Sequence, residues 1–447
     1  MAGIGPSNLL DRHERRRVLA ACFTGTTIEW YDFFLYGSAA ALIFAPQFFP
    51  SLSPFAGSLA AFATFAVGFI ARPIGAIILA HYGDRYGRKS VLVASLMIMG
   101  LATVGIGLLP PYESIGVFAP IALVALRFLQ GIGVGGEWGG AAMLAVEHAP
   151  ANRRGFYGAF PQMGVPAGLV LANAALLAVT ASLPANEFEA WGWRIPFLAS
   201  VVLIGIGMFI RLKVVESPVF AAAAQRSELV RHPTLLVLRR HGKGIALAGG
   251  TFIAGNALGY LYMVYVLSYG SRVLELDRVV LLVAILAGAV LQLVLLPVFG
   301  ALSDRIGRRL VYTWGTAACL LWSFAFFPLI DMRSSAGVAV AVVVMAGLLA
   351  PTFAAQSALF AELFPTPVRY SGSSLAYQMG AVLGGGLAPM VATALHGSGG
   401  SSVLVIAYMV GLCVVSLGCV LAIAETSGRT LTAPANIAEA PASGGAQ

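Results

Sequence analysis

Residues 80–89 read AHYGDRYGRK, and residues 300–309 read GALSDRIGRR. Both stretches fit the pattern small-x-x-x-Asp-Arg-x-Gly-Arg-Lys/Arg, and each lies between two long apolar runs. Their aspartates, Asp84 and Asp304, are 220 residues apart in a chain of 447. A ten-residue motif that returns at about half the chain length indicates a duplicated unit.

Two shorter repeats support the duplication. The pattern Glu-x-x-Pro-x-x-x-Arg occurs at residues 147–154 and again at 362–369, and Gln-Met-Gly occurs at 162–164 and at 378–380. These matches keep the order and nearly the offset of the ten-residue motif. Three ordered matches at nearly one offset rarely arise by chance, so the two halves of the chain are predicted to share one fold.

The composition indicates the class of protein. The chain is 59% hydrophobic and 10% charged, whereas a soluble domain carries about 25% charged residues. So few charged residues cannot cover a water-facing surface, so we expect the chain to lie in the lipid bilayer. A net charge of +8 would suit a nucleic-acid binder, but the lysines and arginines lie in short loops between apolar runs. No nucleic-acid partner is therefore expected.

The apolar runs predict the topology. A bilayer core about 30 Å thick needs about 20 apolar residues per helix. The predicted fold is an all-α membrane protein with twelve transmembrane helices in two pseudo-symmetric six-helix bundles. The predicted spans lie roughly at residues 18–45, 57–82, 90–110, 117–148, 155–181, 194–213, 244–270, 279–302, 310–330, 336–362, 369–395 and 402–424.

The segments outside the bundles divide the chain. Residues 1–17 are predicted to form a cytoplasmic N-terminal segment, followed by bundles at 18–213 and 244–424. Residues 214–243 are predicted to form a cytoplasmic linker, either an amphipathic surface helix or a solvated stretch. The tail at 425–447 is rich in Ala, Pro and Gly and is predicted to be disordered and cytoplasmic.

Charge predicts the orientation. Most of the 27 lysines and arginines fall at the end of the bundle that carries both termini. The arginines predicted at the other end are Arg194, Arg272, Arg278 and Arg333. Because cytoplasmic loops carry the positive excess, both termini are expected on the cytoplasmic side of a multi-pass cell-membrane protein.

Ionisable side chains inside the predicted spans of the first half are Glu29, Asp32, Arg72, Arg127 and Glu137. A charge at the bilayer centre costs about 3 kcal/mol or more, so such residues usually face a cavity, pair or relay protons. Glu29 and Asp32 share one helix face, and two close carboxylates disfavour joint ionisation. We predict proton coupling by Glu29, Asp32, Arg127 and Glu137, with a static ion pair between helices as the alternative.

Substrate contacts are predicted from both halves. Arg72 and Arg127 could meet a substrate carboxylate or pair with a carboxylate of the first span. The interiors of the second-half spans contain no Asp, Glu, Lys or Arg and offer neutral polar side chains, each of which could instead serve packing. The full set of predicted substrate-binding residues is Tyr31, Tyr36, Arg72, Arg127, Gln130, Gln162, Asn256, Tyr260, Gln292, Gln356, Tyr377 and Gln378.

The sequence motifs do not support a catalytic site or a cofactor site. The run GIGVGGEWGG at 131–140 follows no strand and lacks the Lys-Ser/Thr of a phosphate loop. Its glycines at 131, 135 and 139 instead predict a stripe for close helix packing. The four cysteines, Cys22, Cys319, Cys413 and Cys419, lack ligand or disulfide spacing. We expect no enzyme activity, no metal and no cofactor, with the proton gradient as the energy source.

The duplicated loop motif predicts a conformational gate. An aspartate that ends an apolar helix can meet the N-terminus of a neighbouring helix or the segments around Arg154 and Arg369. Such contacts would exist only while the cytoplasmic side is closed, and the alternative is charge that merely sets topology. The predicted gate residues are Asp84, Arg85, Arg88, Arg154, Asp304, Arg305, Arg308 and Arg369.

Together these motifs resemble the major facilitator superfamily, and more narrowly its metabolite:H+ symporter branch. The superfamily resemblance rests on the twelve spans, the duplicated loop motif and Arg127-x-x-Gln130-Gly131. The branch resemblance covers about residues 20–425 and rests on TIEWYDF at 27–33, FIARP at 69–73, GGEWGG at 135–140, WGWRIPF at 191–197 and ESP at 216–218.

The resemblance implies two six-helix bundles that rock about a central site, with import driven by the proton gradient. It places the family's deep acids and arginine on Glu29, Asp32, Arg72, Arg127 and Glu137. The expected function is import of a small organic acid with H+, with shikimate or a related carboxylate as first choice, by a monomer in the inner membrane. The alternatives are an osmolyte (proline or betaine) symporter, a drug/H+ exporter, and a transporter-like sensor or channel.

Three departures bear on these alternatives. The first loop motif begins with Ala80 where the family usually has Gly. The fifth span reads GVPAG at 164–168 rather than the pairing that resembles drug/H+ antiporters, which argues against export. The tail lacks the coiled coil of some osmosensing proline/betaine members, which argues against that substrate class.

Overall fold

A computed structural model describes residues 12–86, 88–135, 137–213, 233–365, 369–397 and 401–429. The side chains of residues 12–16, 80–92, 211–213 and 233–238 lie outside this description. The predicted contacts of Asp84, Arg85 and Arg88 therefore fall outside the described residues, as do most of the predicted linker and most of the predicted tail.

Every regular element in the described part of the chain is helical. The first half contains α1 (Arg12–Ala39), π-helical η1 (Ala40–Phe44), α2 (Ala45–Phe48), α3 (Pro54–Tyr86), α4 (Arg88–Leu108), α5 (Tyr112–Ile115), α6 (Phe118–Val134), α7 (Trp138–Glu147), α8 (Arg154–Ser182), α9 (Ala185–Glu187), π-helical η2 (Phe188–Gly192) and α10 (Arg194–Lys213). The second half contains α12 (Pro233–Tyr260), π-helical η3 (Leu261–Tyr265), α13 (Val266–Arg272), α14 (Arg278–Ile306), α15 (Arg308–Asp331), α16 (Ser335–Leu363), α17 (Arg369–Gly380), π-helical η5 (Ala381–Gly386), α18 (Ala388–His396) and α19 (Val403–Ala422).

These helices give the twelve predicted spans. Among the described residues, nine helical stretches are long and apolar enough to cross a membrane, and the bent pair Ala185–Gly192 with Arg194–Ile210 makes a tenth. The remaining two spans are α1, which carries buried carboxylates, and α4, whose described apolar part is Val93–Leu108. The prediction of an all-α membrane protein with twelve transmembrane helices in two six-helix bundles is confirmed.

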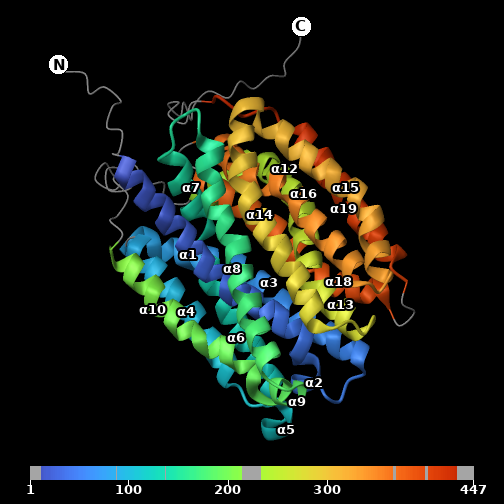
Figure 1. Cartoon of the computed structure of the whole chain (residues 1–447). Coiled ribbons are helices and arrows are strands. Elements are labelled where there is room, and N and C mark those ends of the chain that lie inside the picture. The colour runs from blue at the N-terminus through green and yellow to red at the C-terminus, as the bar shows by residue number, and fades with distance from the viewer. Residues whose placement is uncertain are drawn as a thin grey trace, which may run out of the picture.

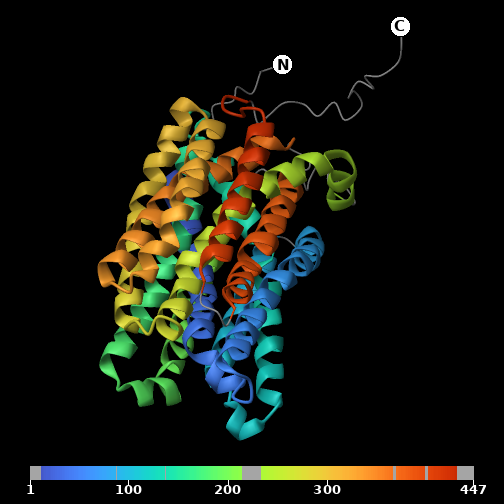
Figure 2. The same ribbon diagram turned by 90° about the vertical axis from the view of Figure 1, so that its right-hand side faces the viewer.

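The helices of both bundles run roughly parallel along an elongated molecule (Figure 1). In Figure 1, α1 (blue) begins and α19 (red) ends at the upper end, whereas the short helices α2, α5 and α9 lie at the opposite end. The turned view keeps this alignment, and α19 again ends at the top (Figure 2). The halves meet where α8 packs on α14 and where α3 packs on η5 and α18.

Two π-helical segments occupy equivalent places in the duplicated unit. Residues 40–44 interrupt the first span and residues 261–265 interrupt the seventh, an offset close to that of the loop motifs. Both segments are fully buried. Because π-helical turns inside α-helices occur frequently at functional sites, both segments are candidates for a functional role.

The fourth predicted span, 117–148, corresponds to the stretch Phe118–Glu147, which is long enough to cross the membrane and is divided into two α-helical segments. Helix α6 ends at Val134 and α7 begins at Trp138. The glycine-rich sequence explains the break, since glycine is a poor helix former. The predicted packing stripe is confirmed, because a Cβ atom on Gly131 would overlap the carbonyl oxygen of Gly68, and one on Gly135 would lie 2.6 Å from Ala76 N.

Candidate functional site

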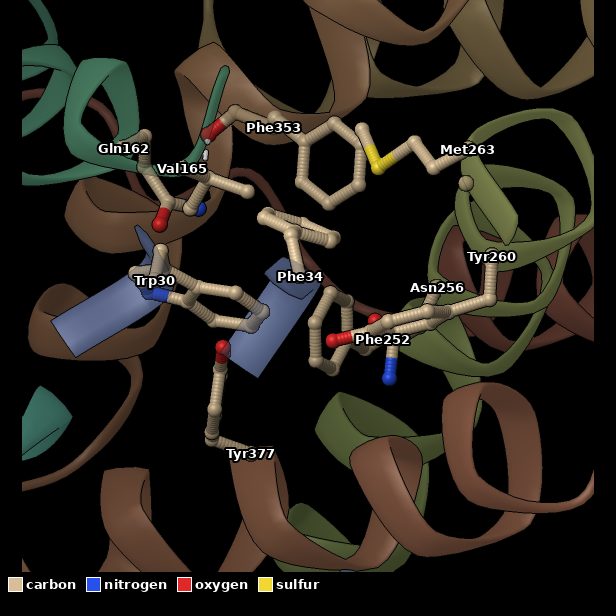
Figure 3. Close-up of a pocket in the computed structure, with 11 residues that line it drawn as sticks. Trp30, Phe34, Gln162, Val165, Phe252, Asn256, Tyr260, Met263, Phe353 and Tyr377 are labelled. Atoms are coloured by element: carbon tan, nitrogen blue, oxygen red, sulfur yellow. Dashed lines mark hydrogen bonds between the residues drawn. The ribbon is translucent and has the colours of Figure 1, made fainter. Parts of the chain in front are cut away.

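A central pocket lies where the two halves meet. In this conformation it is a small cavity of about 10 Å³ between atoms of α1, α8, α12, η3, α16 and α17. Figure 3 shows rings of Trp30, Phe34 and Phe353 around it, with Tyr377 on one side and Asn256 with Tyr260 on another. The full lining is Trp30, Phe34, Gln162, Val165, Phe252, Asn256, Gly259, Tyr260, Met263, Phe353 and Tyr377.

The pocket wall contains polar groups without partners. The indole Nε1–H of Trp30 and the hydroxyl of Tyr260 are buried and have no hydrogen-bond partner among the described residues. An indole N–H can only donate, and a phenol hydroxyl can donate or accept. A buried polar group without a partner costs about 1–3 kcal/mol, so both groups are candidates for contact with a bound molecule.

Two buried arginines flank one aromatic ring beside the pocket. The Arg72 guanidinium carbon lies 4.3 Å from the ring centre of Phe33, and that of Arg127 lies 4.1 Å from the same centre. Arg72 also lies 5.4 Å from the ring centre of Trp30, which is part of the pocket wall. Cation–π contacts of this kind contribute about 2 kcal/mol or more when desolvated, so the rings hold both charges inside the bundle.

The two guanidinium groups retain unused donors. Nε and Nη2 of both Arg72 and Arg127 have no hydrogen-bond partner within the described residues. Arg127 Nη1 donates to Gln130 Oε1 at 2.9 Å, and Gln130 Nε2 donates to Thr103 Oγ1 at 2.7 Å. Arg127 and Gln130, which were predicted to share a helix face, are thus joined by a direct hydrogen bond.

The predicted carboxylates are buried in the first half. Glu29 and Asp32 are each 2% exposed, and Glu137 at the break between α6 and α7 is 6% exposed. Asp32 Oδ1 accepts a hydrogen bond from Ser200 Oγ of α10 at 2.9 Å. A neutral hydroxyl partner permits Asp32 to exist in either protonation state.

The other predicted substrate residues divide into two groups. Gln162, Asn256, Tyr260 and Tyr377 line the pocket, and Gln356 bonds to Gln162 beside it. Four others lie outside the lining and form hydrogen bonds elsewhere. The Tyr31 hydroxyl donates to Pro196 O, the Tyr36 hydroxyl to Thr64 Oγ1, and Gln378 Nε2 to Gly135 O, while Gln292 Oε1 accepts from the Tyr262 hydroxyl.

The sequence analysis missed several wall residues. Trp30, Phe34, Phe252, Met263 and Phe353 line the pocket but were not predicted. Apolar residues within an apolar helix offer no contrast that would single them out. Trp30 had one usable signal, because its position beside Glu29 and Asp32 places it at the same depth.

Charged side chains join the halves at the end where α1 begins and α19 ends, here named the charged end. Asp304 accepts hydrogen bonds from Gly155 N at 2.8 Å and Phe156 N at 2.9 Å, and it pairs with Arg308 at 2.7 Å. The predicted meeting of this aspartate with a neighbouring helix N-terminus is confirmed. Further pairs at 3.5 Å are Arg154–Glu362, Arg308–Glu362 and Arg369–Glu147.

The opposite end is also bridged. Arg278, which begins α14, pairs with Glu189 of η2 at 2.6 Å. Arg272 Nε donates to Ala41 O of η1 at 3.0 Å. Because contacts between the halves exist at both ends, the central pocket is enclosed in this conformation.

Comparison with known proteins agrees with this architecture. A family model described as "Major Facilitator Superfamily" matches residues 22–389 and 281–443. Among solved structures, the partially occluded inward-open xylose transporter XylE from E. coli superposes with a TM-score of 0.71 at 17% identity, covering 93% of this chain and 99% of that chain. At this identity the likeness concerns the fold alone.

Curated relatives cover most of the chain. The inner membrane metabolite transport protein YhjE of Escherichia coli K12 is 41% identical, covering 91% of this chain and 94% of the relative. The shikimate transporter of the same organism is 39% identical, over 86% of this chain and 89% of the relative. Its proline/betaine transporter is 32% identical, over 95% and 86%.

The family model spans most of the chain, and the relatives are multi-pass transporters of small molecules rather than enzymes. The chain therefore belongs to the Major Facilitator Superfamily of membrane transporters.

Proposed function

We propose that the protein imports a small, oxygen-rich organic acid together with H+, with shikimate or a related carboxylate as first choice. The observation that carries the proposal is the excess of buried hydrogen-bond donors around the pocket. Trp30 Nε1–H, the Tyr260 hydroxyl, and Nε and Nη2 of Arg72 have no partners among the described residues. Carboxylate and hydroxyl oxygens of a substrate would supply the missing acceptors.

The rest of the wall suits a compact ring. Phe34, Phe252 and Phe353 present aromatic surface, while Gln162 and Asn256 present amides. An apolar ring face would pack on the aromatic side chains, and ring hydroxyls would bond to the amides. The shikimate transporter among the relatives supports this substrate class.

Proton coupling follows from the buried acids. Glu29 and Asp32 lie three residues apart in α1, and both are almost completely buried. Two close carboxylates disfavour joint ionisation, so one of them is suited to carry a proton. Membrane carboxylates commonly serve as proton relays. We assign coupling to Glu29, Asp32, Arg127 and Glu137, with no further cofactor.

Orientation follows from charge. The charged end carries most of the lysines and arginines, and cytoplasmic segments carry such an excess. We therefore place the charged end, and both termini, on the cytoplasmic side of the cell membrane. In this orientation the contacts of Asp304, Arg308 and Arg369 close the cytoplasmic side.

A second candidate substrate is a zwitterionic osmolyte. An aromatic wall also suits a quaternary ammonium group through cation–π contact, and the proline/betaine transporter among the relatives supports it. Both candidates carry a carboxylate, but the ring hydroxyl oxygens of shikimate offer further acceptors for the unpartnered donors, which favours the acid.

The test is substrate counterflow into proteoliposomes preloaded with unlabelled compound. Labelled shikimate, 2-oxoglutarate, citrate, proline and betaine would each be exchanged against the same unlabelled compound, and the methyl ester of shikimate would be added as a competitor. The proposal expects exchange of at least one free acid, with its neutral ester about tenfold or more weaker as a competitor because the Arg72 donors lose an anionic acceptor. Exchange of betaine or proline with no acid exchanged would support the osmolyte instead.

A further inference from the structure

Trp138 lies behind the pocket and joins the two halves. Its ring stacks on Tyr377 of α17 with ring centres 3.8 Å apart and planes at 12°, and its edge meets Phe360 of α16 at 6.2 Å. Trp138 is buried and is not part of the lining, whereas its neighbours Tyr377 and Gln162 are. The ring therefore supports the pocket wall from outside.

This contact involves helices that run from the pocket to the charged end. Gln162 is eight residues from Arg154, which begins α8, and Tyr377 is eight residues from Arg369, which begins α17. Eight helical residues span about 12 Å. Closure of the pocket toward the charged end thus includes the stack of Trp138 on Tyr377.

A chain of hydrogen bonds starts at the same indole. Trp138 Nε1–H donates to Gln162 Oε1 at 3.1 Å. Gln162 Nε2 donates to Gln356 Oε1 at 2.9 Å and to Phe353 O at 3.2 Å, both in the other half. The chain therefore crosses the boundary between the halves at the edge of the pocket.

The indole and the Phe353 carbonyl, which accepts from the Gln162 NH2 group, together determine the direction of this chain. Because an indole N–H can only donate, the amide oxygen of Gln162 must face Trp138 and its NH2 group must face the second half. Gln356 must then present its oxygen to Gln162. Its own NH2 group is left buried, without a partner among the described residues. This direction thus leaves the Gln356 NH2 group as an unused donor at the end of the hydrogen-bond chain.

The helix break that carries Trp138 is held on both sides by α17. Before the break, Gly135 O accepts a hydrogen bond from Gln378 Nε2 at 3.0 Å. After it, Trp138 stacks on the adjacent residue, Tyr377. Gly135 and Trp138 therefore both contact α17 in this conformation.

We propose that Trp138 is a positioning residue with two separable roles in transport. Its ring closes the pocket toward the charged end through Tyr377. Its N–H orients the Gln162–Gln356 chain so that the Gln356 amide faces substrate oxygen as a donor. The second role rests on the proposed function, whereas the first requires only that the protein alternates between conformations.

The gating role of the Trp138 ring is tested by measuring the accessibility of a thiol. In a variant with the four native cysteines replaced, Ser357→Cys places a buried thiol next to Gln356, on the side of the charged end. Trp138→Leu should raise its labelling rate by a permeant maleimide about threefold to tenfold, because an aromatic pair changes an equilibrium by roughly 2- to 12-fold. Trp138→Phe retains a ring and should stay within about twofold of the parent.

A second variant separates gating from general loosening. Tyr377→Leu should raise the labelling rate as Trp138→Leu does, and the double variant should label no faster than the faster single variant. Unchanged labelling in both leucine variants, or additive effects in the double variant, would overturn the gating role. This arm needs no substrate, so its outcome is independent of the proposed function.

The role of the Trp138 N–H is tested by the transport kinetics of the acid that the protein carries. Trp138→Phe should raise KM about threefold to tenfold with kcat nearly unchanged, because the Gln162 amide then loses one of the two contacts that fix its orientation and keeps only the Phe353 carbonyl. Gln356→Leu should raise KM similarly, with no further rise in the double variant. Trp322→Phe is the matched control, since it removes an indole N–H that donates to Ala341 O at 3.2 Å within the second half. An equal KM in Trp138→Phe and parent would overturn this role.

Discussion

Asp304 caps helix α8 across the boundary between the halves, with its Oδ1 accepting a hydrogen bond from the backbone N–H of Gly155 at 2.8 Å. A carboxylate is stabilised at a helix N-terminus by the unsatisfied N–H groups and the helix dipole. Arg308, at 2.7 Å, holds the carboxylate in place. The contact joins a residue of one half to a helix of the other, so its formation depends on closure of the charged end.

Asp304→Asn should therefore favour opening of that end. The substitution removes the negative charge and one acceptor, and we expect labelling of Ser357→Cys to rise about tenfold, which corresponds to about 1.4 kcal/mol. Asp277→Asn is the matched control, because Asp277 caps its own helix α14 through Val279 N and makes no other side-chain hydrogen bond or ion pair within the described part of the chain. Equal labelling in the two variants would show that the Asp304 cap does not control closure.

Tyr260→Phe should separate stability from binding. The Tyr260 hydroxyl is buried without a partner in the described structure, and its removal should leave the ligand-free protein equally stable or about 1 kcal/mol more stable. Affinity for the accepted acid should fall about tenfold. Thermal unfolding with and without ligand measures both quantities. A less stable ligand-free protein with unchanged affinity would contradict the assignment of this hydroxyl to the substrate.

Arg72→Gln and Arg127→Gln test the anionic substrate. Each change removes a guanidinium that retains unused donors, and we expect counterflow of the acid to fall by about 100-fold or more in at least one variant, because charge-assisted bonds are the strong ones. Size-exclusion profiles check folding. Arg194→Gln is the control, since Arg194 lies over Trp193 outside the pocket lining. Full counterflow in both variants would remove the arginines from substrate binding.

Asp32→Asn tests proton coupling. Asparagine can still accept the hydrogen bond from Ser200 Oγ, so the local structure should persist while the titratable group is lost. We expect accumulation driven by a proton gradient to disappear and counterflow to remain. Ser200→Ala, which removes the hydrogen-bond partner and keeps the carboxylate, should retain accumulation. If Asp32→Asn still accumulates substrate, the proton carrier is Glu29 or Glu137.

The ion pair at the opposite end is expected to matter less. Arg278 and Glu189 pair at 2.6 Å, but their side chains are 30% and 47% exposed. Exposed pairs contribute about 1 kcal/mol or less. Arg278→Gln should change counterflow rates by less than about fivefold, and salt should have little further effect on the variant. A loss of counterflow as large as that of Arg72→Gln or Arg127→Gln would mean that this ion pair is a principal gate.

Patterns within one helix were predictable, because helical geometry fixes them. The bond between Arg127 and Gln130 follows from residues three apart on one face. The cap formed by Asp304 followed from an acid at a helix end in a repeated motif. The twelve spans followed from hydropathy and bilayer thickness alone.

Contacts between the halves were not predictable to the same degree. The stack of Trp138 on Tyr377 joins residues more than 200 positions apart, and it depends on how two folded bundles dock. The break after Val134 was also missed, since the glycine-rich run reads equally well as a packing stripe. Tyr31 and Tyr36 looked like substrate ligands, but their hydroxyls bond within the first half.

The most direct test of the central claim is uptake into proteoliposomes under an imposed inward proton gradient. The account predicts that shikimate or a related acid accumulates above its external concentration and that a protonophore collapses the accumulation. Equilibration of the acid without accumulation, unaffected by the protonophore, would contradict a proton-coupled symporter.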